Sequence, residues 1–255
     1  KSKYYFTDFQ ITGTFFAMLT WKTLKIFTKM KKILLHTAAV LISAILFTSC
    51  RIDSPQLFYS YMTAVKEQPS DKSISYLVTD DSTTVYPEWF DALSRMKHNQ
   101  RLLATFTVPS GELGDQIKAN FQSYGYVTED SIKVTTRPDT LGKDPVSITE
   151  AWHSGGIYGA GRFVTVSFVI SGAGLHSHSV SLVDNSGSVN PDAEGYWNLT
   201  LRHNANGDPQ GYQSQAVYSF PLPEQYTASG IKGLRITYQP LNSTSAQTVT
   251  IPYAN

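Results

Sequence analysis

The sequence RFVTVSFVIS, at residues 162–171, has an apolar side chain at every second position. These residues are Val164, Val166, Phe168 and Ile170. Because successive side chains of a strand point to opposite faces, the stretch predicts a β-strand with one buried face. The same period recurs in three later segments: Trp197, Leu199 and Leu201; Leu234, Ile236 and Tyr238; and Val249, Ile251 and Tyr253. Together these residues are the predicted core of an all-β domain.

The C-terminal half of the chain is a series of such strands separated by turn residues. Seven segments fit the pattern: Val146 to Trp152, Arg162 to Ser171, His176 to Val183, Gly195 to His203, Tyr212 to Phe220, Gly233 to Gln239 and Gln247 to Tyr253. Short strands of this number and spacing are typical of a sandwich. The sequence therefore predicts an antiparallel β-sandwich over residues 142–255.

A smaller group of strands precedes the predicted sandwich. Its segments are Leu57 to Val65, Ser73 to Thr79, Thr83 to Tyr86, Arg101 to Val108 and Ser131 to Thr136, with one short helical pattern at Glu88 to His98. The polar residues 80–82 predict a hairpin between the second and third strands. Proline, glycine and charged residues then interrupt the pattern in RPDTLGKDP, residues 137–145. We therefore expect a small β domain, a barrel or compact sandwich, over residues 57–141.

The segment upstream of both domains resembles an export signal. MKKILLHTAAVLISAILFTSC, residues 30–50, has two lysines, an apolar run of about fifteen residues and then Cys50, as in a lipobox. The run is shorter than the roughly 20 residues of a membrane-spanning helix. We predict a signal peptide at 30–49, a lipidated tether at 50–56 and an upstream extension outside the fold at 1–29. Acyl chains such as palmitate on Cys50 would anchor the mature protein in the outer membrane, each buried methylene contributing about 0.8 kcal/mol.

Charge and cysteine usage narrow the class of protein. Residues 1–49 hold seven lysines and one aspartate, so the predicted mature chain has 14 basic and 19 acidic residues. A net charge near −5 argues against a nucleic-acid partner, because binding to phosphates depends on clustered Lys and Arg. The single cysteine excludes a disulfide within the monomer.

The order of these features resembles the NigD-like lipoproteins. A lipobox and small β domain are followed by Asp144-Pro145, Trp152, a strand and LRHNANGDP at residues 201–209, the most specific element. The resemblance is strongest from residue 142 to residue 253. It implies an OB-like barrel followed by a C-terminal β-sandwich. The family takes its name from a gene in a bacteriocin locus, and the resemblance brings no catalytic residues with it.

No motif for a nucleophile elbow, a metalloprotease, a Walker loop or a dinucleotide fold is present in the sequence, and no cofactor is expected. GGIYGAG at residues 155–161 lacks a following helix pattern, which favours a loop over a phosphate cradle. His176 and His178 would share a strand face and are weak metal candidates. A site would need a further ligand such as His153 or His203, so we predict no metal. In the LRHNANGDP stretch, Asn206-Gly207 predicts a tight type I′ hairpin turn rather than a calcium loop.

Tyrosines near glycine are the remaining candidate feature: Tyr124, Tyr126, Tyr158, Tyr196 and Tyr212. A phenol ring can stack on a sugar or a peptide, although buried tyrosines in sandwiches usually serve packing. We take Tyr158, Tyr196 and Tyr212 as the candidate ligand-binding residues. The sequence favours a non-enzymatic envelope lipoprotein that binds a protein, peptide or glycan, with a role in protection against a bacteriocin as the family name suggests. The alternatives are a structural subunit of an outer-membrane complex and a hydrolase with an unrecognised site.

Overall fold

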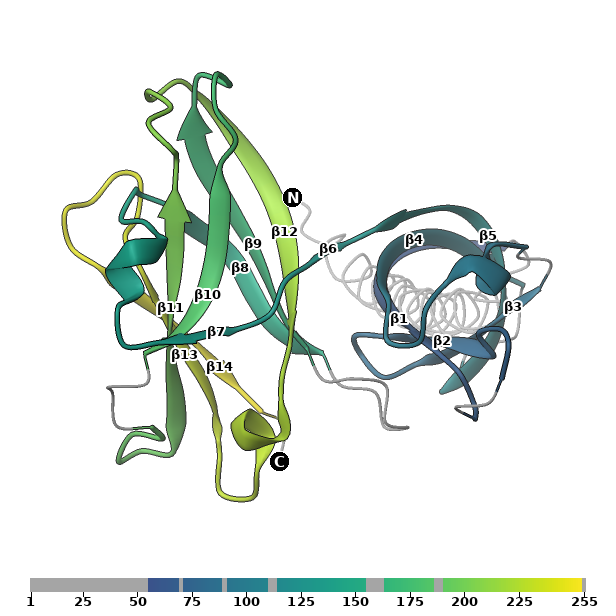
Figure 1. Ribbon diagram of the computed structural model, residues 1–255. Helices are drawn as coiled ribbons and strands as arrows, with labels where there is room; N and C mark the ends of the chain where they lie inside the picture. The colour runs from purple at the N-terminus through teal and green to yellow at the C-terminus, as the bar shows by residue number, and fades with distance from the viewer. Residues whose placement is uncertain are drawn as a thin grey trace, which may run out of the picture. The chain divides into compact units, whose positions relative to one another are not determined.

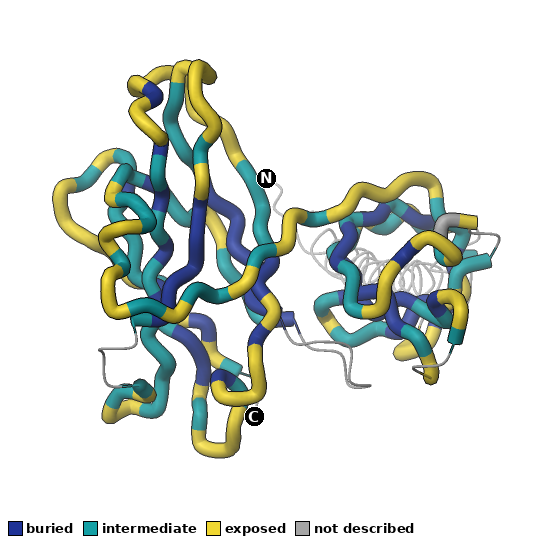
Figure 2. The backbone as a smooth tube through the Cα atoms, in the orientation of Figure 1, coloured by how far each residue is buried: buried dark blue, intermediate teal, exposed yellow. Residues whose placement is uncertain are grey.

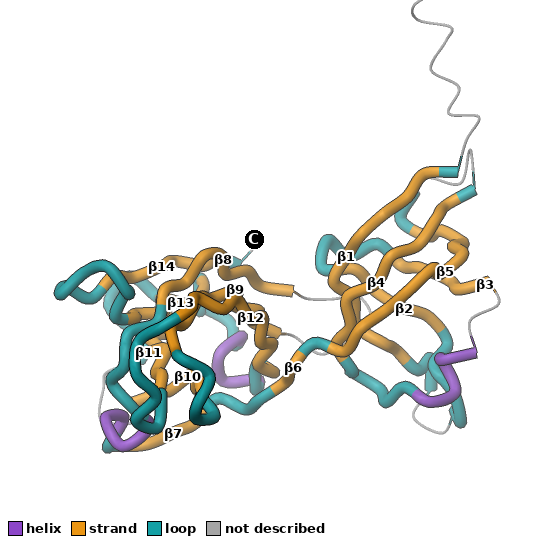
Figure 3. Tube along the Cα trace, turned by 90° about the horizontal axis from the view of Figure 1, so that it is seen from above, coloured by secondary structure: helices purple, strands orange, loops and turns teal. Residues whose placement is uncertain are grey.

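The computed structural model describes residues 55–68, 71–88, 91–109, 114–154, 163–185 and 190–253. Residues Ser54–Asn255 form one compact unit. The predicted signal peptide, Cys50, Tyr158 and the glycine-rich stretch 155–161 lie outside the described residues. Strands dominate the described chain, and its helical turns are the three short 3-10 helices η1 (Asp91–Arg95), η2 (Pro138–Leu141) and η3 (Glu224–Thr227) (Figure 3). The all-β prediction is confirmed, and η1 stands where the short helix was expected.

The first domain is a closed five-stranded barrel. Its strands are β1 (Gln56–Val65), β2 (Tyr76–Thr79), β3 (Thr84–Glu88), β4 (Arg101–Val108) and β5 (Gln116–Tyr126). They close in the order β1-β2-β3-β5-β4, with a parallel pair between β3 and β5 (Figure 1). The barrel core contains Met62, Leu77, Leu102 and Phe106, all essentially buried. This arrangement confirms the small OB-like barrel, and the predicted hairpin is the antiparallel pair of β2 and β3.

The fifth barrel strand was not predicted, and a segment assigned to the barrel belongs to the sandwich. In β5 only Ile117 and Ala119 are buried, and the rest of the strand is exposed or half-buried, so its sequence carries little apolar alternation. The segment predicted at residues 131–136 contains β7 (Lys133–Thr135), which pairs with a sandwich strand, as does β6 (Thr128–Glu129). The sandwich thus begins before residues 137–145, the proline-containing stretch that was expected to mark the boundary. The partners with which a strand pairs, and not the turn residues near it, decide to which domain it belongs.

The second domain packs two sheets face to face. One sheet has the order β14-β13-β11-β10-β7 and the other has the order β6-β12-β9-β8. The remaining strands are β8 (Ser147–Ser154), β9 (Phe163–Gly172), β10 (Ser179–Asn185), β11 (Tyr196–Asn204), β12 (Tyr212–Pro221), β13 (Gly233–Tyr238) and β14 (Gln247–Pro252). Each of the seven predicted strands is therefore present. Most neighbours are antiparallel, whereas β11 and β13 run parallel, as do β6 and β7 with their partners.

The predicted core residues line the space between the two sheets. The buried segments of these strands are dark blue in Figure 2. Val164, Val166 and Phe168 of β9 are at most 1% exposed, and they share one cluster with Leu199, Leu201, Leu234, Ile236 and Ile251 of the opposite sheet. Each large apolar side chain buried in this way contributes about 1.5 to 3 kcal/mol. Ile170, Trp197, Tyr238, Val249 and Tyr253 pack at the edges of this core, half-buried.

Arg101, at the start of β4, is a fully buried cation that joins the barrel to the sandwich. Its guanidinium binds both carboxylate oxygens of Asp80, at 2.5 and 2.8 Å. Its other N–H groups donate to Thr63 in the barrel at 3.0 Å and to the sandwich hydroxyls of Thr165 at 3.1 Å and Ser219 at 3.3 Å. All five side-chain donors are therefore used, which is the condition for a buried charge to be accommodated.

The turn in the LRHNANGDP stretch has the predicted backbone and a different role. Asn206 and Gly207 have φ values of 51° and 79°, and the amide of Asp208 donates to the carbonyl of Ala205 at 2.9 Å. These features confirm the type I′ turn. It is not a hairpin tip, because β11 and β12 belong to different sheets. The turn instead carries the chain from one layer of the sandwich to the other.

Candidate functional site

A groove lined by tyrosines lies over β1, β4 and β5 of the barrel, and two residues of the sandwich, Thr128 of β6 and Val217 of β12, also line it. We call it the tyrosine groove, defined by Tyr59, Tyr61, Tyr124, Gly125 and Tyr126. Its volume is about 320 Å³, and the other lining residues are Leu103, Thr105, Ser123, Val127, Thr128 and Val217. This size is at the lower end of the range for small-ligand sites.

Strand register places the floor of the groove. Tyr61 of β1 is paired with Leu103 of β4, and Leu103 is paired with Gly125 of β5. In the same way, Tyr59 is paired with Thr105, which is paired with Ser123. Directly paired residues of neighbouring strands project on the same face of a sheet. The two rows therefore run side by side across three strands and form one surface.

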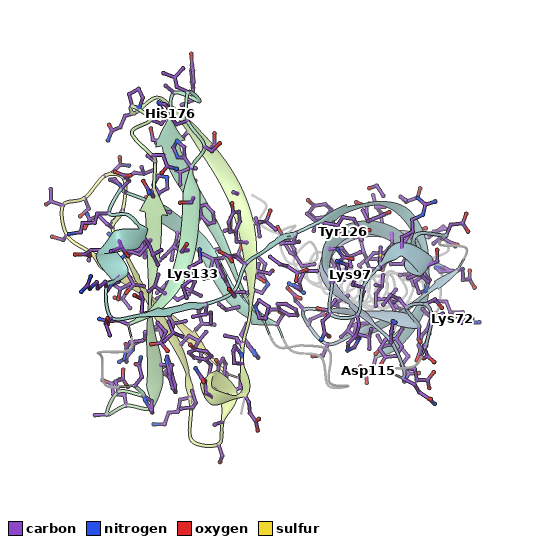
Figure 4. All side chains as sticks on the ribbon, in the orientation of Figure 1. Lys72, Lys97, Asp115, Tyr126, Lys133 and His176 are labelled. Carbon is purple, nitrogen blue, oxygen red and sulfur yellow. The ribbon has the colours of Figure 1, made fainter. Side chains whose placement is uncertain are left out.

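The aromatic rings of the groove are unusually exposed. Tyr59 is 71% exposed and Tyr126 is 51% exposed, and the ring of Tyr126 meets that of Tyr124 edge-on with centroids 5.6 Å apart. Tyr126 is one of the labelled side chains on the barrel in Figure 4. Tyr61 is held more firmly, because its ring packs against that of Trp152 with centroids 5.1 Å apart. Burial raises the pKa of Tyr61, so its hydroxyl stays protonated at neutral pH.

Gly125 has no structural reason of its own to be glycine. Apart from its chain neighbours Tyr124 and Tyr126, a Cβ built on it would meet no atom within 4 Å, and its φ lies outside the positive range that favours glycine. Glycine in the interior of a strand weakens the strand and often marks close approach by a ligand or another backbone. The bare backbone at this position leaves open space above the floor of the groove.

The chemistry available in the groove is stacking and neutral hydrogen bonding. Its described lining residues include hydroxyls from Thr105, Ser123 and Thr128 and the tyrosine phenols, and none of them is Asp, Glu, Lys or Arg. Hydroxyls both donate and accept hydrogen bonds. The groove is therefore suited to holding a neutral polar molecule and offers no carboxylate or imidazole for acid–base catalysis.

The histidine predictions have a different outcome. The strand β10 begins at Ser179, so His176 and His178 lie in the loop before it and the predicted shared strand face is wrong. His176 is exposed at one end of the sandwich (Figure 4). His178 reaches inward to His203, and His153 packs against Tyr253 instead, with ring centroids 4.6 Å apart. Within the described ranges no three His, Cys, Asp or Glu side chains are grouped to hold a metal ion.

His178 is part of a hydrogen-bonded chain that closes one end of the sandwich. The Nδ1 of His203 lies 2.8 Å from the Pro145 carbonyl oxygen, so it must donate there, and its Nε2 accepts from Nδ1 of His178 at 2.8 Å. The Nε2 of His178 then donates to Asp208 at 2.9 Å. Both ring nitrogens of His178 are therefore engaged, one by His203 and the other by Asp208.

The surroundings of these hydrogen-bonded side chains shift the pKa values of Asp208 and His203. The hydrogen bond from His178, together with the amides of Gly174 and Leu175, lowers the pKa of Asp208 to about 2. Burial lowers the pKa of His203, which keeps that ring neutral. A Cβ at Gly172 would lie 2.5 Å from the Asp208 carboxylate, so the close approach requires glycine there. The partner of Asp208 is therefore His178.

The sandwich tyrosines predicted to bind ligand are not brought together. Tyr196 begins β11, where the Arg235 guanidinium lies 4.5 Å from the centre of its ring. Tyr212 begins β12, after the turn at the other end of β11, and is 86% exposed. The length of β11 separates the two, so they cannot contact one small ligand. Among the tyrosines of the groove, Tyr124 and Tyr126 could be singled out from the sequence because each is next to Gly125. Tyr59 and Tyr61 could not, because they lie in a largely apolar strand.

Comparison with known proteins identifies the second domain. Residues 130–253 match the family described as the NigD-like C-terminal beta sandwich domain. The second domain of this chain is NigD-like. The match begins next to β6, in agreement with the strand pairing that places the start of the sandwich there. No functionally curated protein matches the chain.

Solved structures share the fold along most of this chain. A protein from Parabacteroides distasonis, provisionally described as toxin-related, is 23% identical with a TM-score of 0.59, over 76% of this chain and 93% of that one. A NigD-like immunity protein from Bacteroides caccae is 20% identical with a TM-score of 0.51, over 77% and 92%. A protein from Bacteroides fragilis, provisionally described as a lipoprotein, is 10% identical with a TM-score of 0.56, over 78% and 99%.

The described residues contain no helix with the length and apolar character needed to span a bilayer.

Proposed function

We propose that this chain is a non-enzymatic lipoprotein of the bacterial envelope that binds a partner through the tyrosine groove. The observation that carries the proposal is the exposed ring of Tyr59 on the same barrel face as Gly125, a strand glycine that has open space over it apart from its two chain neighbours. Exposed aromatic surface on a folded domain commonly marks a binding site. The absence of charged side chains among the described lining residues favours binding over acid–base catalysis.

The envelope location rests on the sequence before the fold. The signal pattern at residues 30–49 and the sole cysteine at position 50 predict transfer of acyl chains to Cys50 and anchoring in the outer membrane. A structural neighbour described provisionally as a lipoprotein supports this proposal. The tether at 50–56 would then hold the barrel close to the membrane surface.

A protective role is the biological context we propose for this binding. Structural neighbours are described as an immunity protein and, provisionally, as toxin-related. Binding at the envelope is compatible with protection, because a lipid-anchored protein can occupy a receptor or a surface component without chemical change. This context is argued from fold-level likeness alone.

The proposal is tested by capture of envelope material with the full lipoprotein, tagged at Asn255. Detergent-solubilised envelopes of the native host are incubated with the wild type and with Tyr59→Ala combined with Tyr126→Ala, and bound protein and carbohydrate are both quantified. Tyr86→Ala is the matched control, because Tyr86 is an exposed barrel tyrosine that does not line the groove. Capture lost by the groove variant and kept by Tyr86→Ala supports the proposal.

Equal capture by all three proteins would show that the groove is not the binding site. The location is tested separately by labelling with a radioactive fatty acid, which should mark the wild type and not Cys50→Ala. Label in neither protein would refute lipid anchoring.

A further inference from the structure

We infer that the tyrosine groove takes a segment of a neutral carbohydrate chain, with the sugar face lying on Gly125. This inference rests on the proposed binding function and assigns its ligand class. Three independent features of the groove point to a sugar: the open floor, the exposed rings, and a lining that has hydroxyls and no charge.

The open floor permits a flat ring to approach the sheet. The row from Tyr61 through Leu103 to Gly125 ends in a residue without a side chain, and a Cβ at Gly125 would meet no atom within 4 Å apart from its two chain neighbours. A glycine that supports no turn and relieves no clash costs strand stability. That cost is explained if a ligand occupies the space directly above the backbone of β5.

The exposed rings supply the apolar contacts that a sugar uses. A pyranose presents one face of C–H groups, and these groups pack against the face of a phenol ring as other apolar groups do. Tyr59 and Tyr61 are two residues apart on β1, so their rings project on the same face as Leu103 and Gly125. Two rings along one strand can hold successive sugar units of one chain.

The hydroxyls and the missing charge discriminate between ligand classes. Nucleic acid would need Lys or Arg beside its phosphates, and an acidic polysaccharide would need the same cations. Neither residue type is among the described lining residues. The side chains of Thr105, Ser123 and Thr128 can both donate and accept, which matches the hydroxyls of a neutral sugar.

The size of the groove also argues against a folded protein as its main occupant. Stable protein–protein interfaces bury roughly 1,200–2,000 Å² over a broad surface. A groove of about 320 Å³ is suited to a few units of a narrow chain. A chain segment can also enter a surface groove without a free end, as a long envelope glycan would have to do.

The test is titration of the purified mature lipoprotein with neutral hexasaccharides, measured by calorimetry. The probes are maltohexaose, cellohexaose, mannohexaose and xylohexaose, and hexagalacturonate and oligo-dT serve as charged controls. We expect at least one neutral probe to bind and neither charged control to do so. Binding of a charged control with no neutral probe bound would overturn the inference.

The informative variant is Gly125→Val, because its side chain projects into the space over the floor of the groove. Apart from its two chain neighbours, a Cβ at this position meets no atom within 4 Å, and valine favours strands, so the variant should fold with an unchanged or higher melting temperature. We expect it to weaken sugar binding at least ten-fold, as should Tyr59→Ala, whereas Tyr86→Ala stays within two-fold of the wild type. Unchanged binding by Gly125→Val would contradict the inference.

Failure of this inference is distinguishable from failure of the proposed function. If envelope capture depends on Tyr59 and Tyr126 but no neutral sugar binds, the groove binds another ligand class and only the carbohydrate assignment is refuted. If capture is insensitive to the groove variants, both proposals are refuted together.

Discussion

Replacement of Arg101 by methionine should be one of the most destabilising changes in the described chain. The substitution keeps a long apolar side chain and removes all five N–H donors from a site with 0% exposure. The Asp80 carboxylate, itself only 15% exposed, then loses its bidentate partner and keeps the Trp152 indole N–H at 2.6 Å. Thr165 and Ser219 still bond to each other at 2.8 Å.

The expected loss of stability follows from the Asp80 carboxylate, which remains buried without its cationic partner. Removing one partner of a buried ion pair typically costs about 3–5 kcal/mol, because the other charge stays buried without compensation. Since Asp80 keeps one donor, we expect a loss near the lower end, about 3 kcal/mol in the free energy of unfolding. That is a large share of the roughly 5–15 kcal/mol that stabilises a typical protein.

The measurement is urea unfolding followed by tryptophan fluorescence and circular dichroism. Lys118→Met is the matched control, since Lys118 is an exposed cation on β5 and its loss should change stability by less than about 0.5 kcal/mol. Adding Asp80→Asn to Arg101→Met should restore about 1–2 kcal/mol, because no buried charge is then left unpaired. A loss below about 1 kcal/mol for Arg101→Met, or strict additivity of the two changes, would refute the assigned role of Arg101.

Three further substitutions test the sandwich. The pKa of Asp208 falls from 3.8 to about 2 on folding, mainly through the hydrogen bond from His178. Asp208 therefore contributes stability that is lost as the pH drops from about 4 to about 2. Asp208→Asn should abolish this pH dependence of the urea unfolding midpoint. Tyr226→Phe should cost about 1–3 kcal/mol, because the buried Asp184 carboxylate loses a donor at 2.9 Å, and thermal unfolding that matches the wild type would contradict this. Gly142→Ala should lower the melting temperature markedly, since φ is 106° and the new Cβ would lie 2.1 Å from a backbone oxygen of β11; an unchanged melting temperature would show that the loop can shift.

Several features of this protein follow from local sequence alone. The alternation in residues 162–171 determines a strand and its buried face, because the side-chain period of a strand is two wherever the strand lies. Asn206-Gly207 determines a type I′ turn, since its two positive φ values are intrinsic to those residue types. The signal pattern before Cys50 is likewise read from neighbouring residues.

Tertiary structure decided which strands pair and what their outer faces form. β5 joins the barrel with few apolar residues of its own, and β6 and β7 join the sandwich although they precede the proline-rich stretch. In the sequence Arg101 is simply the first residue of a predicted strand, whereas in the structure it is fully buried and hydrogen-bonds to both domains. The tyrosine groove depends on the register of β1, β4 and β5, so Tyr59 and Gly125 line one groove only after these strands pair. Periodicity is local, whereas register is set by contacts between residues far apart in the chain, and that is why the sequence predicted the strands but not the site.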